Sequence, residues 1–80
     1  MVAEIDTLIN AITDFLEEKK PIAAIEEATT PFIIDDGNML KDKKLSEIVY
    51  MLDMHDIENL SRKEIIELRN ELIAYRHTLD

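Results

Sequence analysis

Three arginines in the C-terminal part of the chain, Arg62, Arg69 and Arg76, recur at intervals of seven residues. Ile66 and Ile73 recur at the same interval beside them. Because seven residues make nearly two helical turns, a helix would align each series along its axis. Arginine series that run beside apolar series are typical of helix–helix interfaces with charged flanks. The spacing therefore predicts a partner-binding face formed by these side chains.

The same pattern has an alternative interpretation, in which the arginines serve the fold itself. A small bundle needs wide apolar faces on its helices. Guanidinium groups at the edge of such a face would then pair with acidic side chains of the first helix. Both interpretations are open at the level of sequence.

A second group of charged side chains, Asp14, Glu17 and Glu18, lies near the end of the first predicted helix. Asp14 and Glu18 stand one turn apart, and like charges at that spacing slightly destabilise a helix. A binding function would explain them, either through a basic protein or through mimicry of nucleic-acid phosphates in a basic groove. The alternative is a solvated face that keeps a small protein dissolved.

The charge of the whole chain indicates what kind of partner such surfaces would meet. The formal net charge is −9. The first forty residues hold nine acidic and two basic side chains, a balance of −7, and the second forty hold nine acidic and seven basic, a balance of −2. An acidic N-terminal half repels nucleic acid and anionic lipid and attracts basic surfaces. We therefore expect another protein with a basic or amphipathic surface as the partner.

The remaining residues carry no catalytic or cofactor motif. No serine, threonine or lysine stands at motif spacing from an activating base. Asp53, His55, Asp56 and Glu58 resemble metal ligands in type, but no second histidine is near them in sequence, and we interpret them as a polar loop. We expect no catalytic residue, no cofactor and no metal, and we predict that the chain is not an enzyme.

The elements that would position these side chains are helices. Residues 2–19 have helical periodicity, which places the apolar side chains on one arc of about 140°. That arc holds Val2, Ile5, Leu8, Ile9, Ile12, Phe15 and Leu16. Pro21 ends this helix or opens a second, short helix over residues 21–28, because proline fits only the first turn.

The centre of the chain has the weakest helical pattern. A Thr-Thr-Pro sequence at residues 29–31 is expected to interrupt the second helix. Residues 32–34 fit a strand, a helical turn or a packed loop, and the lack of a partner strand favours the last two. Residues 35–38, Asp-Asp-Gly-Asn, are a strong turn sequence. We therefore predict an irregular central segment around residues 29–42.

Two further helices are predicted in the second half. The third spans about residues 43–54, with an apolar stripe of Leu45, Ile48, Val49 and Leu52. The fourth begins at a capping box from Ser61 to Glu64 and extends to about residue 79. Its apolar stripe consists of Ile65, Leu68, Leu72, Tyr75 and Leu79.

These elements predict one all-α domain over residues 1–80, a small bundle of about four helices. One glycine and two prolines leave little turn chemistry for a multi-stranded β-fold. The chain has no cysteine, no signal-peptide pattern and no apolar run as long as a membrane span, so we expect a cytoplasmic protein that does not enter a membrane. A bundle this small often gains stability by association, so a homodimer is consistent with the sequence.

We predict a small acidic, non-enzymatic interaction protein that regulates or inhibits another protein through its helical faces. Size, acidity and the lack of catalytic motifs are typical of proteins from phages and other mobile elements. One alternative is a DNA-binding regulator whose third and fourth helices form a helix-turn-helix, although the net charge disfavours nucleic acid. The other alternative is a structural or assembly subunit that forms a helical homodimer.

Overall fold

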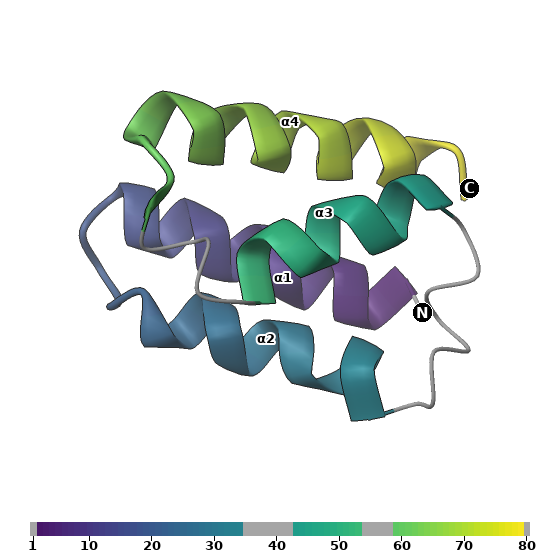
Figure 1. Cartoon of the computed structure of the whole chain (residues 1–80), viewed down its shortest axis with the longest axis horizontal. Helices are drawn as coiled ribbons and strands as arrows, with labels where there is room; N and C mark the ends of the chain where they lie inside the picture. Colours follow the sequence, from purple (N-terminus) through teal and green to yellow (C-terminus); the bar gives the residue numbers. More distant parts are fainter. Residues whose placement is uncertain (1, 35–42, 54–58, 80) are drawn as a thin grey trace.

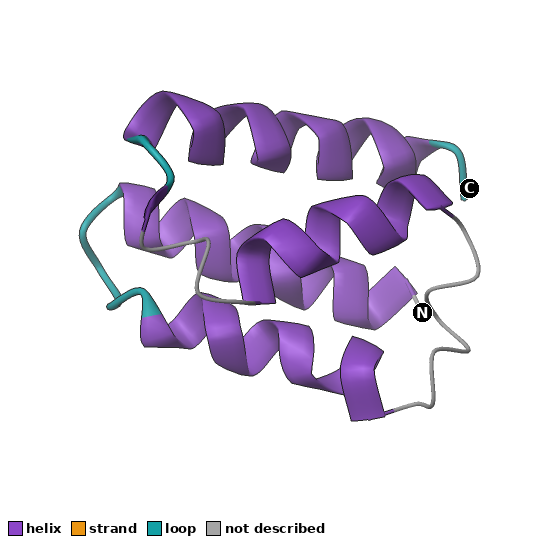
Figure 2. Cartoon of the chain, in the orientation of Figure 1, coloured by secondary structure: helices purple, strands orange, loops and turns teal. Residues whose placement is uncertain are grey.

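The computed structural model of this chain is an all-α bundle, as the sequence predicts (Figure 1). It describes residues 2–34, 43–53 and 59–79. The helices in these ranges are α1 (Val2–Leu16), α2 (Ala23–Ile34), α3 (Lys43–Asp53) and α4 (Arg62–His77). Among the described residues no strand is present (Figure 2).

The helices run up and down in turn, so that each lies antiparallel to the next along the chain (Figure 1). α1 packs against α2 and α4, and α3 packs against the same two helices from the other side. The contact between α3 and α4 is the least extensive of these four. The arrangement of these helices is that of an up-and-down four-helix bundle.

The core is made by the apolar stripes that the periodicity of the sequence predicts. In α1, Ile5, Leu8 and Ile12 are fully buried, whereas Val2 and Ile9 at the edge of the predicted arc are half-buried. The predicted stripe of α3 is buried throughout, and in α4 the first three residues of the stripe are buried. The core members of these two helices are Leu45, Ile48, Val49, Leu52, Ile65, Leu68 and Leu72.

The start of α4 has the predicted capping box. The Ser61 hydroxyl accepts a hydrogen bond from the Glu64 amide at 3.2 Å. The same hydroxyl donates to the Glu64 carboxylate at 3.1 Å. In a standard capping box that carboxylate would instead accept from the backbone amide of Ser61. Leu60 packs against the core and Ile65 is buried, in agreement with a hydrophobic staple.

The second helix differs from the prediction. α2 continues through residues 29–34, so the irregular segment predicted around residues 29–42 does not begin at residue 29, and residues 35–42 lie outside the described residues. Pro31 has no amide proton for the carbonyl of Glu27. Nearby, the Thr29 and Thr30 hydroxyls both donate to the Glu26 carbonyl, at 2.6 and 3.3 Å. The complete burial of Phe32 offsets the cost of proline within a helix.

The first helix is shorter than predicted, and it ends in a left-handed residue. The amide of Glu18 donates to the Phe15 carbonyl at 3.1 Å, and the amide of Lys19 donates to the Asp14 carbonyl at 2.8 Å. This pair of bonds is a Schellman motif, which requires a left-handed residue at the position of Glu18. The φ angle of Glu18 is 63°, where a side chain with a Cβ atom is disfavoured.

Replacing Glu18 with glycine is therefore expected to stabilise the protein by about 0.5–1 kcal/mol. Glycine removes the left-handed penalty of about 1–2 kcal/mol, less the entropy that it adds to the unfolded chain. Thermal denaturation followed by circular dichroism would measure the effect. The control is Glu17→Gly, which removes the same charge at a neighbouring position without a positive φ and should lower the stability. Stabilisation by both variants would mean that charge, and not backbone conformation, is the cause.

Candidate protein-binding surfaces

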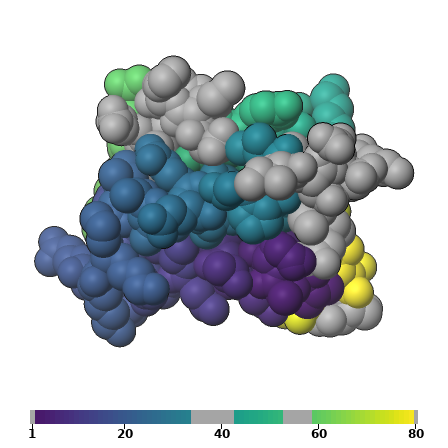
Figure 3. Space-filling view, turned by 90° about the horizontal axis from the view of Figure 1, so that it is seen from below, coloured from purple at the N-terminus to yellow at the C-terminus, as the bar shows by residue number. Residues whose placement is uncertain are grey.

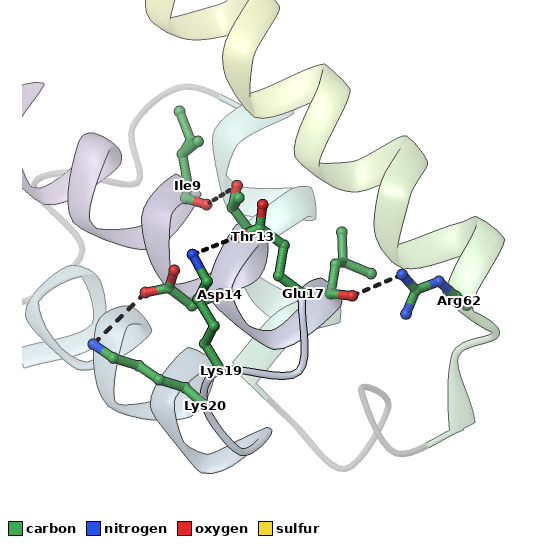
Figure 4. A network of polar contacts seen from close by, with 8 residues as sticks. Ile9, Thr13, Asp14, Glu17, Lys19, Lys20 and Arg62 are labelled. Atoms are coloured by element: carbon green, nitrogen blue, oxygen red, sulfur yellow. Dashed lines mark hydrogen bonds and ion pairs between the residues drawn. The ribbon is translucent and has the colours of Figure 1, made fainter.

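Arg62, Arg69 and Arg76 lie along one side of α4, and we call them the arginine line. Arg62 and Arg76 both contact α1. Arg62 donates from Nη2 to the Leu16 carbonyl at 2.7 Å, so its guanidinium is directed at the C-terminal end of α1 (Figure 4). The last turn of α1 has no basic residue of its own. Arg62 therefore supplies the positive charge that the carboxyl end of a helix favours.

Arg76 is held at the opposite end of α1. Its Nε lies 3.0 Å from the Asp6 carboxylate, and the two side chains are 24% and 49% exposed. A pair this accessible to water contributes less than about 1 kcal/mol. The contact is the internal pairing of an arginine with an acid of the first helix that the alternative interpretation of the sequence describes. Arg62 differs from that interpretation, because it binds a backbone carbonyl.

Arg69, midway between these two, has a different environment. Its Nε atom is buried and has no hydrogen-bond partner. A buried donor without an acceptor costs about 1–3 kcal/mol. Half-buried Ile66 and Ile73 precede and follow it by about one turn on the same side of α4. We call Ile66, Arg69 and Ile73 the Arg–Ile face.

Comparison with protein-family models, with curated proteins and with solved structures finds no match.

The acidic residues Asp14, Glu17 and Glu18, which we call the α1 acidic surface, lie in the last turn of α1 and just beyond it. Lys20 Nζ lies 3.8 Å from the Asp14 carboxylate (Figure 4). Lys19 Nζ lies 3.2 Å from the Glu17 carboxylate. The left-handed turn at Glu18 thus brings both lysines of the first half back over these acids. The turn reduces the local charge that the sequence predicts for this surface.

The acids of this surface nevertheless occupy an unfavourable position. The carboxyl end of a helix carries a partial negative charge, so Glu17 and Glu18 are repelled there. The Lys19–Glu17 pair is more than half exposed on both sides and offsets little of that cost. The presence of two glutamates at this unfavourable end of α1 is consistent with a binding function for them.

Two grooves lie between pairs of the described helices. A groove of about 320 Å³ lies between α1 and α2, which are side by side on the face in Figure 3, and Asp14, Lys20 and Glu27 are among its lining residues. A second groove of about 630 Å³ lies between α3 and α4, with Ile48 and Met51 among its apolar lining. The sequence predicts neither groove. The feature of the sequence that relates to the groove between α3 and α4 is Met51, an apolar residue outside the apolar stripe of α3.

The other sequence features with chemical potential add no site within the described part of the chain. In residues 2–34, 43–53 and 59–79 no group of three or more side chains could hold a metal ion. His55, Asp56 and Glu58, and the turn sequence at residues 35–38, lie outside those ranges. Among the same residues no helix has the length and hydropathy to cross a bilayer.

Proposed function

We propose that this chain is a non-enzymatic protein-binding domain that regulates or inhibits its target by covering a basic or amphipathic surface on it. The observation that carries the proposal is the Arg–Ile face. Two half-buried isoleucines there lie about one turn before and one turn after a half-buried arginine, Arg69. Apolar side chains around a charged donor are typical of the centre of a protein–protein interface, where arginine is enriched.

The α1 acidic surface supplies a second contact in this proposal. Its acids and the exposed Arg62 both lie at the end of the bundle where α1 ends and α4 begins (Figure 4). A target with a basic rim and an apolar centre would match both surfaces. Charges at the rim of an interface act mainly on association rate and specificity, so the Arg–Ile face carries most of the affinity.

The helix-turn-helix alternative has no observation in its favour. Arg62 would open the recognition helix, but its guanidinium is bonded to the Leu16 carbonyl. The homodimer alternative uses the same face as the proposal and is an outcome of the test below.

Replacing Ile73 with glutamate is expected to weaken target capture at least tenfold and to leave the bundle folded, because Ile73 is only half-buried. The measurement is affinity capture from the lysate of the native host with equal amounts of each variant. Ala74→Glu is the matched control, since it adds the same charge at the next, exposed position of α4. Circular dichroism and light scattering would establish that fold and oligomeric state are unchanged.

An Ile73→Glu variant that keeps every captured protein and its oligomeric state would refute the proposed face. If the variant loses self-association and nothing else, the chain is a homodimer subunit and not a regulator. The triple reversal Asp14→Lys, Glu17→Lys and Glu18→Lys tests the α1 acidic surface in the same assay. Unchanged capture would remove that surface from the interface.

A further inference from the structure

We infer that the groove between α3 and α4 binds an amphipathic helix of the partner protein, with basic residues on both flanks of its apolar side. The inference rests on the proposed function and adds a second site and the chemistry of the segment that fills it. At 100° per residue, Glu71 of the groove lining lies about 150° around α4 from Ile66 and Ile73. The groove is therefore separate from the Arg–Ile face.

The apolar part of the groove comes from both helices. α3 packs less extensively on α4 than on α2, and the groove between α3 and α4 has a volume of about 630 Å³. Ile48 of α3 and Leu68 of α4 belong to the buried core and line it from the two sides. Met51 lines it as well and is 39% exposed, and its unbranched thioether adapts to apolar partners of different shape. An apolar groove between two helices accepts the apolar side of a third helix.

The charges on the two walls indicate which helix fits. Glu47 on α3 and Glu71 on α4 are both exposed lining residues, so each wall has a carboxylate. Glu67, also exposed, stands one turn before Glu71 on the same helix, and like charges at that spacing slightly destabilise a helix. A docked helix with a lysine or arginine on each flank complements both walls.

The groove has the opposite charge at one end. Lys43 and Lys44 line it where α3 begins, and the start of a helix carries a partial positive charge of its own. The carboxyl end of a docked helix, which is partially negative, is the complement of that end. The basic flanks of the partner helix therefore lie beside Glu47 and Glu71, and the partner helix runs antiparallel to α3.

A second copy of this chain does not match this chemistry. The formal net charge of −9 makes two copies repel one another. The helices α1 and α2 contain no lysine or arginine. In α4, Arg62 and Arg76 are bound to α1. The occupant that the groove fits is therefore a basic helix of another protein.

The test is a selection from a displayed library of helical peptides. The peptides have leucine fixed at i and i+4 and all amino acids at i+1 and i+3, which flank the leucines on either side. The wild-type chain is expected to enrich lysine or arginine at both varied positions. A chain with Glu47→Lys and Glu71→Lys should enrich aspartate or glutamate there instead. The control has Glu17→Lys and Glu18→Lys, which change the net charge equally outside the groove, and should select as wild type does.

The selected basic peptide then gives the magnitude. We expect the Glu47→Lys, Glu71→Lys chain to raise its Kd at least about tenfold, because two attractive pairs become repulsive. Met51→Glu should raise the Kd by a similar factor, whereas Ile73→Glu should leave it unchanged. Added salt should weaken binding to the wild-type chain, since the pairs are exposed. A reversed charge preference also establishes that the double variant is folded.

The outcomes separate this inference from the proposed function. Selected peptides without basic residues, or a double variant that selects as wild type does, overturn the basic flanks. A wild-type chain that selects no peptide overturns the helical occupant, while capture with Ile73→Glu still decides the proposed function. Self-association of the wild-type chain that Met51→Glu abolishes would assign the groove to a second copy and overturn the partner helix.

Discussion

Alanine in place of Phe32 is expected to lower the free energy of unfolding by about 3–5 kcal/mol. Phe32 is fully buried, and it is the largest of the fully buried side chains. Its removal costs the transfer free energy of the ring and leaves a cavity that the surrounding helices fill only in part. A chain of 80 residues has a total stability of only about 4–12 kcal/mol, so the variant loses a large fraction of it.

Ile33→Ala is the matched control for this prediction. Ile33 is the next residue of α2 and is 42% exposed, so its truncation should cost less than about 1 kcal/mol. Urea denaturation followed by circular dichroism at 222 nm would compare the two variants with the wild-type chain. Similar losses from both substitutions would show that the last turn of α2 does not pack as described.

The burial of Phe32 also explains what the sequence could not reveal about α2. For α1, α3 and α4 the apolar period of about 3.6 residues and the capping box were sufficient to place the helices. In α2, Ile25, Ala28 and Phe32 have the same spacing and are all buried. The threonines and Pro31 conceal that period, because local propensity predicts a helix end there. Tertiary packing of Phe32 overrides that local preference.

The sequence likewise predicted part of the candidate site and not the rest. The seven-residue spacing of the arginines was sufficient to place them on one side of α4. It could not show which of them finds an acceptor, because that depends on the position of the Leu16 carbonyl and of Asp6 across the interface with α1. The ion pairs of Lys19 and Lys20 depend on the positive φ of Glu18, a conformation that sequence propensity does not predict for glutamate.

Replacing Pro31 with alanine is expected to raise the free energy of unfolding by about 2 kcal/mol. A proline in a helix interior costs about 3 kcal/mol relative to alanine, since it removes one amide donor and its ring crowds the preceding turn. Alanine would restore a donor for the Glu27 carbonyl. Part of the gain, about 0.4–1 kcal/mol, is lost because alanine leaves the unfolded chain freer than proline does. Pro31 is exposed, so the substitution leaves no cavity.

Pro21→Ala separates the two contributions, because Pro21 lies outside the helices in the turn before α2 and is exposed as well. Its carbonyl accepts from the Ala24 amide at 3.0 Å, and that bond survives the substitution. Only the unfolded-state effect then remains, and Pro21→Ala should lower the stability by about 0.4–1 kcal/mol. The same chemical change is thus expected to act with opposite sign ten residues apart. A loss of stability in Pro31→Ala, measured by urea denaturation beside Pro21→Ala, would mean that α2 has adapted its last turn to the proline at no cost. The burial of Phe32 would then have no helix penalty to offset.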